Sequence, residues 1–113
     1  MAERRNPKKL NPLQMRTLAL LQELARHPQT STTQSDGSVT ITMLPQKHGN
    51  HVHIGARVAL VKDASGLWNE KVWNALHRKG MAEGMFPVAI TLTPEGLAYD
   101  TASVAGILHG SDH

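Results

Sequence analysis

Three histidines stand close together near the middle of the chain, at His48, His51 and His53. Neutral imidazoles separated by two or three residues can bind one transition-metal ion. His51 and His53 would share one face of a strand. The chain has no cysteine, and no acidic residue stands next to this cluster. A polar hairpin tip is therefore the favoured interpretation, and we expect neither a metal nor another cofactor.

A second group of polar residues lies between residues 67 and 79. An asparagine can pair with the edge of adenine, an arginine with the edge of guanine, and a lysine can reach phosphates. If this segment is a helix that buries its apolar side, the outward residues include Asn69, Lys71, Asn74 and Arg78. We predict that these four contact DNA. The alternative is that this helix face is only solvated. The carboxylate of Glu70 on the same face would repel phosphates, which favours that alternative.

Basic residues concentrate at the start of the chain. Residues 1–26 contain six Lys and Arg residues against two Glu, whereas the whole chain has a net charge of +3. Residues 1–9 lack hydrophobic periodicity, which predicts a flexible arm. Its basic residues Arg4, Arg5, Lys8 and Lys9 are candidates for phosphate contacts. The alternative is a solubilising tail.

The sequence contains no convincing catalytic motif. Asp63, Ser65 and His77 superficially resemble a nucleophilic triad, but no strand-to-helix elbow surrounds the serine. The chain also lacks a glycine-rich phosphate loop after a strand and a paired acidic motif for two metals. We therefore expect that the protein is not an enzyme.

Length and composition indicate one small domain. The chain has 113 residues, of which 40% are hydrophobic and four are aromatic. Its longest apolar stretch is far shorter than the ~18 residues of a membrane span, and no apolar run follows the basic start as in a signal peptide. The absence of cysteine fits a reducing compartment. We predict a cytoplasmic domain over residues 10–108, with a disordered tail at 109–113 and no membrane contact.

The first half of the chain predicts one helix and at least one strand. Asn11 can cap a helix over residues 12–26, with Gln14 as its capping-box partner and Leu10 and Met15 spaced as a hydrophobic staple. Residues 29–38 are expected to form a loop. Alternation over residues 39–45 indicates a strand, followed by a turn at 47–50. Residues 52–62 leave two possibilities: a hairpin that pairs 39–45 with 52–60, or a single strand followed by a short helix near 56–63.

Helical periodicity returns over residues 67–79, which Gly80 should end. Its inward side would carry Trp68, Val72, Trp73 and Leu76, and this arrangement turns the four DNA-contact candidates outward. Residues 81–86 and 88–92 then predict a hairpin. A last helix should begin after Thr93 and reach about Leu108. Its alanines, Ala98, Ala102 and Ala105, would allow close approach of a second helix or would cover the core of the same domain.

Two segments carry a resemblance to a known family. Asn74-Ala-Leu-His-Arg-Lys-Gly-Met81 looks like the end of a recognition helix, and Val88-Ala-Ile-Thr-Leu-Thr-Pro-Glu-Gly96 looks like the strand and helix that follow a wing. This order of elements resembles the winged helix-turn-helix domain of the multiple-antibiotic-resistance regulator (MarR) and PadR families. The resemblance covers about residues 56–99, and the helix at 12–26 fits the first helix of that domain. Gly66, Leu67 and Val72 match the spacing of the helix-turn-helix, whereas Lys62 replaces its expected small residue.

The resemblance implies an α+β winged helix-turn-helix fold, made of helices with a small antiparallel β-hairpin wing. It also implies sequence-specific binding of duplex DNA by a transcriptional regulator, as a homodimer through the C-terminal helix. The predicted wing, Glu83-Gly-Met-Phe86, departs from the family pattern because it has no basic residue. A winged helix that binds another protein instead of DNA is the alternative.

Overall fold

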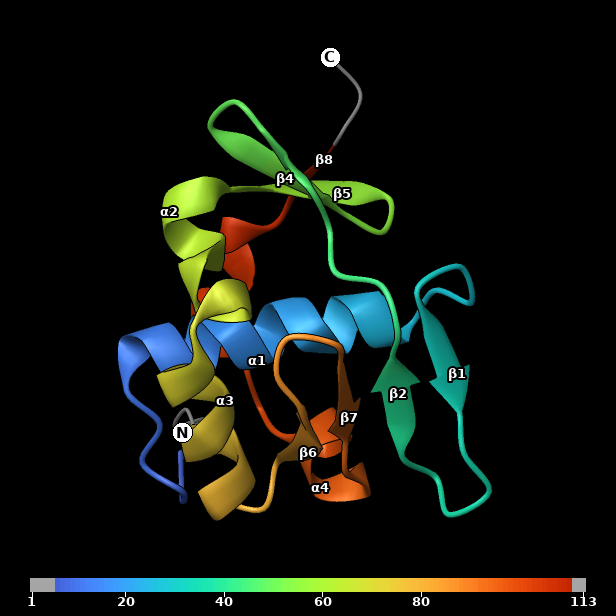
Figure 1. The fold of residues 1–113 in the computed structure, drawn as a ribbon. Coiled ribbons are helices and arrows are strands. Elements are labelled where there is room, and N and C mark those ends of the chain that lie inside the picture. The colour runs from blue at the N-terminus through green and yellow to red at the C-terminus, as the bar shows by residue number, and fades with distance from the viewer. Residues whose placement is uncertain (1–5, 111–113) are drawn as a thin grey trace.

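Helix α1 (Pro12–Ala25) runs through the centre of the fold in the computed structural model, which describes residues 6–110 (Figure 1). The predicted capping box is confirmed: the Gln14 N–H donates to Asn11 Oδ1 (2.8 Å), and the Asn11 N–H donates to Gln14 Oε1 (3.0 Å). Leu10 and Met15, the predicted staple pair, are both buried. The start of α1 is therefore determined by residues that are neighbours in sequence.

The first sheet packs on α1 and contains β1 (Ser31–Thr33), β2 (Val39–Ile41), β6 (Ala82–Met85) and β7 (Ala89–Leu92). It is antiparallel, with the order β1-β2-β7-β6. The predicted hairpin at β6–β7 is confirmed, and the predicted strand over residues 39–45 is confirmed only as far as Ile41, where β2 ends. The prediction of a loop over residues 29–38 is wrong at residues 31–33, where β1 pairs with β2 across the Asp36–Gly37 turn. Its Ser and Thr side chains give no hydrophobic alternation that could have indicated a strand.

A second antiparallel sheet is formed mainly by the residues between β2 and the next helix along the chain, and its last strand comes from residues 109–110. It comprises β3 (Lys47–His48), β4 (His51–Ile54), β5 (Arg57–Leu60) and β8 (His109–Gly110), in that order. The predicted turn at 47–50 is confined to Gly49–Asn50. Both alternatives for residues 52–62 are wrong: β5 pairs with β4 instead of β2, and the short helix begins only at Val61.

Three short helical segments follow β5: α2 (Val61–Ala64), the 3-10 turn η1 (Ser65–Trp68) and α3 (Glu70–Arg78). The predicted helix over 67–79 is confirmed in its centre and at its end, where Gly80 has φ +79°. Its predicted start is wrong. Asn69 is extended (φ −117°, ψ 107°), and its side chain accepts a hydrogen bond from the Lys71 N–H (3.0 Å). The chain therefore breaks at Asn69, and α3 starts after it.

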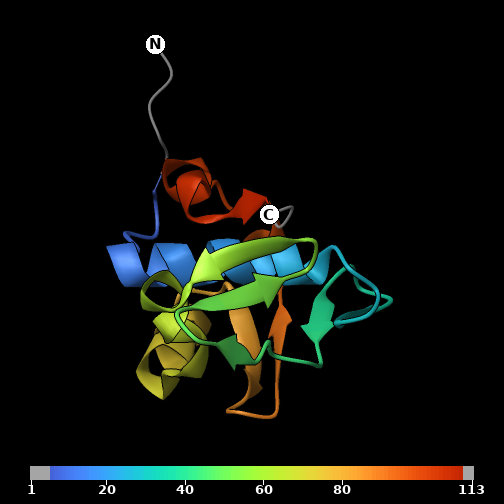
Figure 2. The same cartoon turned by 90° about the horizontal axis from the view of Figure 1, so that it is seen from above.

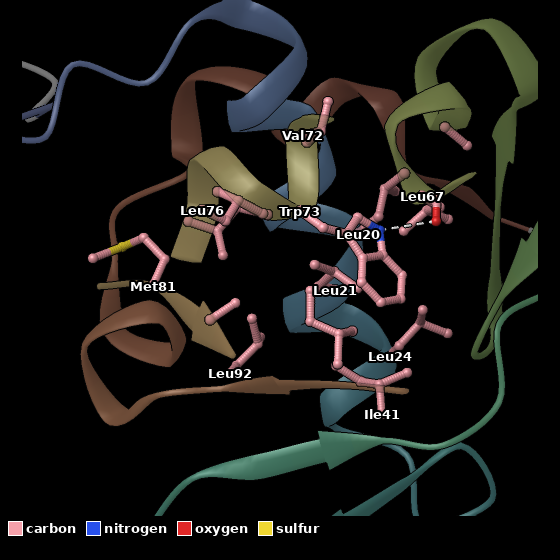
Figure 3. Close-up of a cluster of buried hydrophobic side chains, with 14 of the residues drawn as sticks. Leu20, Leu21, Leu24, Ile41, Leu67, Val72, Trp73, Leu76, Met81 and Leu92 are labelled. Carbon is pink, nitrogen blue, oxygen red and sulfur yellow. Dashed lines mark hydrogen bonds between the residues drawn. The ribbon is translucent and has the colours of Figure 1, made fainter. Parts of the chain in front are cut away.

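The core lies where α1, α3 and the first sheet meet (Figure 3). Leucines of α1 fill its centre, and Trp73 enters it from α3. The indole Nε1–H of Trp73 donates to the backbone oxygen of Leu67 (3.1 Å), shown as a dashed line in Figure 3. This bond satisfies the polar atom of a buried aromatic residue. It also ties the first turn of α3 to η1, so the direction in which α3 leaves the core is well determined.

The C-terminal segment forms two short pieces, α4 (Pro94–Ala98) and the 3-10 segment η2 (Ala102–Ile107). The prediction of one helix from Thr93 to Leu108 is wrong beyond Ala98, because Tyr99 is extended (φ −63°, ψ 139°). The buried amide of Gln22 on α1 donates to the backbone oxygens of Gly96 and Tyr99, each at 2.9 Å. These tertiary bonds replace the intrahelical bonds that would have continued the helix.

Seen from above, η2 lies on one side of α1, and α3 lies on the other side together with the β6–β7 hairpin (Figure 2). In the region predicted to be a tail, His109 and Gly110 pair with β5, whereas residues 111–113 lie outside the described part. At the other end, Asn6–Lys9 of the predicted arm form a turn against the domain. The Asn6 side chain bonds to the backbone of Leu10 (2.9 Å) and accepts from the Tyr99 hydroxyl (2.6 Å).

Candidate nucleic-acid interface

Helix α3 is amphipathic, and its exposed side carries three of the predicted DNA-contacting residues. Val72, Trp73, Ala75 and Leu76 are buried. Lys71, Asn74 and Arg78 are exposed, and their spacing of three and four residues places them in one line along the helix surface. The structure therefore brings these three together, with both charged groups free of the core.

Asn69, the fourth predicted residue of this group, has a different position. It is half-buried, and its side-chain oxygen accepts the Lys71 N–H as the N-cap of α3. A bidentate contact to adenine needs both the oxygen and the nitrogen of an asparagine amide. Because the oxygen is engaged in the cap, the main role of Asn69 is to determine where α3 starts and in which direction its first turn runs.

Part of the predicted basic arm lies at the C-terminal end of α3. Lys79 Nζ donates to the backbone oxygens of Lys8 (2.8 Å) and Lys9 (3.4 Å). Lys8 Nζ lies 3.7 Å from Glu95 Oε2, and the Lys8 N–H donates to the Tyr99 hydroxyl (2.9 Å). The structure thus brings Lys8 and Lys9 close to the α3 end that carries Arg78. Arg4 and Arg5 lie outside the described residues.

A groove of about 280 Å³ separates α3 from the β6–β7 hairpin. Glu70, Asn74 and His77 line it from α3, and Glu83 and Met85 line it from β6. His77 was not among the predicted contact residues, although it follows Asn74 by three residues and therefore lies on the same side of the helix. The two carboxylates disfavour a phosphate inside the groove. Phosphate contacts therefore fit better on the side of α3 that carries Lys71 and Arg78.

The tip of the β6–β7 hairpin is apolar. Met85 and Val88 are 71% and 69% exposed. Phe86 is anchored edge-on against Trp73, with ring centroids 4.8 Å apart, and the Phe86–Pro87 peptide bond is cis. The tip is thus fixed to α3 through Phe86 and presents two flanking apolar side chains outward.

The remaining predicted candidates lie elsewhere. His48, His51 and His53 are on the second sheet, and Asp63 lies 3.9 Å from Arg16. Comparison with protein-family models, with curated proteins and with solved structures finds no match for this chain. Among residues 6–110, no helix combines the length and the apolar character that crossing a membrane requires.

Proposed function

We propose that this chain is a winged helix-turn-helix domain that binds duplex DNA through α3 and acts as a cytoplasmic transcriptional regulator. The order α1, β2, α2, α3, β6, β7 supports this proposal, because it is the order that the sequence resemblance implies. The pairing of β2 with β7, and of β7 with β6, would form the small antiparallel sheet of such a domain, to which β1 adds a further strand. The strands β3, β4 and β5 are then an insertion between the first strand and the second helix.

The observation that carries the proposal is the exposed line of Lys71, Asn74 and Arg78 on a helix whose other side is buried. A helix that enters the major groove needs a protruding polar side of this kind and a core that holds it rigidly. Asn74 and Arg78 have the chemistry to read base edges, and Lys71 has the chemistry to contact phosphate. Arg4, Arg5, Lys8 and Lys9 would add affinity that does not depend on sequence.

Fluorescence anisotropy with a duplex selected from a random pool tests the proposal. Arg78→Ala and Asn74→Ala should each weaken binding to the selected duplex by about 1–3 kcal/mol, or roughly 5- to 150-fold, and should affect a scrambled duplex much less. Arg57→Ala removes the same charge from an exposed position on β5 and should change both affinities only slightly. Deletion of residues 1–5 should lower the dependence of affinity on salt.

Two results would contradict the proposal. If duplex DNA shifts no amide NMR resonance of residues 70–78 at low salt, α3 does not bind DNA. If Arg57→Ala weakens binding as much as Arg78→Ala, the interaction is a general charge effect. An unchanged salt dependence after the deletion would remove the arm from the proposal.

A protein-binding winged helix is the second candidate, and the hairpin tip favours it. Met85 and Val88 are exposed there, and Glu70 and Glu83 line the adjacent groove. An apolar surface flanked by carboxylates suits a protein segment better than a phosphate backbone. If this second candidate is correct, duplex DNA shifts no amide NMR resonance of α3 even at low salt. The same outcome contradicts DNA binding.

The proposal includes a homodimer through the C-terminal segment. Ala98, Ala102 and Ala105 are all exposed, but they are divided between α4 and η2, so a partner would contact two short pieces instead of one continuous helix. Sedimentation equilibrium should give twice the chain mass of 12.3 kDa, and Ala102→Glu should give the monomer. A wild-type monomer would remove the dimer from the proposal and leave DNA binding to be judged separately.

A further inference from the structure

The second sheet gathers histidines on one face. His48 and His51 are direct cross-strand partners next to the Gly49–Asn50 turn, and residues paired in this way point to the same side of a sheet. His53 follows His51 by two residues on β4, so it also points to that side. The opposite face carries Val52 and Ile54, which are fully buried. The three imidazoles therefore share the face of this hairpin that is turned away from the core.

The three rings also lie close to one another. Their centroids are 5.3 Å apart for His48 and His53, 5.4 Å for His51 and His53, and 6.1 Å for His48 and His51. Two imidazoles that bind one tetrahedral zinc ion through Zn–N bonds of about 2.0–2.1 Å have centroids about 5 Å apart. All three separations are close to that value.

The surroundings leave room for a cation. Lys47 pairs with Val52 and so points to the opposite face, where its Nζ lies 4.7 Å from the centre of the Trp68 ring. Its charge is therefore directed away from the imidazoles. His48 and His53 also line a cavity of about 570 Å³, which provides space for water ligands on a bound ion. His48 and His53 are exposed and His51 is half-buried, so the site is open to solvent.

We propose that His48, His51 and His53 bind a single divalent transition-metal ion of the zinc class. Three neutral nitrogen ligands suit zinc, copper or nickel better than magnesium or calcium, which prefer oxygen. With the side chains of residues 6–110 as they stand, no group of three or more His, Cys, Asp or Glu residues could hold a metal ion, and the three histidines are no exception. Binding therefore requires rotation of the rings, a motion that exposed side chains make on the nanosecond scale. Water completes the coordination.

The test is a titration of the full chain with zinc chloride, followed through the imidazole nitrogens by NMR. We expect saturation at one equivalent, with shifts confined to His48, His51 and His53. His48→Gln should lower the zinc affinity by more than about tenfold, since it removes a direct ligand. His109→Gln is the matched control. His109 pairs with Val58 and lies on the same face as His53, but β5 separates the two strands, a distance of about 10 Å.

A second measurement distinguishes a loss of zinc binding from a loss of folding. Zinc should raise the melting temperature of the wild type and of His109→Gln, and it should leave that of His48→Gln unchanged. The amide spectrum without metal establishes that each variant is folded, and His53→Gln replaces His48→Gln if the latter is not. Failure to saturate at millimolar zinc, equal shifts at His77 and His109, or an unchanged affinity in both ligand variants would each overturn the proposal. In Figure 1, β4 and β5 lie at the top of the molecule and α3 lies in its lower half, so this outcome is independent of DNA binding by α3.

Discussion

Replacing Gly66 with alanine would test the contact that holds η1, and through it α3, against α1. Gly66 is buried, and a Cβ at this position would collide with Thr17 Oγ1. It would also lie 3.1 Å from Thr17 Cβ and 3.5 Å from Leu13 Cδ1. Both neighbours belong to α1, whose backbone cannot easily retreat. The close packing of η1 on α1 therefore depends on the missing side chain.

The size of the effect follows from two terms. Overpacking of a well-filled core costs about 1–3 kcal/mol. Rotating the Thr17 side chain out of the way breaks its hydrogen bond to the Leu13 oxygen (2.8 Å), which costs about 1 kcal/mol. We expect Gly66→Ala to lower the free energy of unfolding by about 3 kcal/mol. Thr17→Ala removes the colliding atom, so in the double variant the cost of the new methyl group should fall by about half or more.

Urea unfolding followed by tryptophan fluorescence gives these free energies by linear extrapolation. Gly106→Ala is the control, because a Cβ there would meet no atom within 4 Å, and its effect should stay within about 0.5 kcal/mol. A loss below about 1 kcal/mol for Gly66→Ala would refute the close approach of η1 to α1. Strict additivity of Gly66→Ala and Thr17→Ala would show that the two residues do not collide.

Two further predictions concern polar contacts. Gln22→Leu should lower the free energy of unfolding by about 2–3 kcal/mol in the same urea assay. It removes the partner of the backbone oxygens that accept from Gln22 and of the Thr101 hydroxyl that donates to it (2.7 Å). An effect no larger than that of Gly106→Ala would contradict this prediction. Hydrogen bonds from the hydroxyl and the N–H of Ser38 lower the pKa of Asp36. The folded state therefore favours the carboxylate, a stabilisation that is present above the ordinary aspartate pKa and is lost as the pH falls through the lowered value. The Ser38 amide shift should titrate with a midpoint below the ordinary aspartate value and should stop titrating in Asp36→Asn; a midpoint at or above that value would contradict the hydrogen bonds.

Elements that depend on neighbouring residues could be predicted from the sequence. The capping box of Asn11 and Gln14 and the stop at Gly80 are local signals, and both are found in the structure. Elements that depend on distant contacts could not. β1 has polar side chains on both faces and forms because β2 is beside it. The predicted C-terminal helix ends early because Gln22, more than seventy residues earlier, takes its carbonyl groups.

The same distinction applies to the candidate sites. The exposed line on α3 follows from its helical period, so Lys71, Asn74 and Arg78 could be found from the sequence. The role of Asn69 was missed because the predicted helix starts at residue 67, three residues before the observed start at Glu70. The contact of Lys79 with Lys8 and Lys9 joins residues about seventy positions apart and has no local signal. The grouping of the histidines depends on the register that pairs His48 with His51, which spacing alone leaves open.

The position of β7 in the middle of the first sheet has a consequence for how the chain is made. β2 ends at Ile41, but the strand that pairs with its inner edge ends only at Leu92. Contacts between residues so far apart in sequence form slowly. The pairs β3–β4 and β4–β5 join near neighbours and can form soon after they leave the ribosome. One edge of β2 stays unpaired until β7 is made, and one edge of β5 until the short strand β8 is made. During that interval the nascent chain is most open to association with another strand.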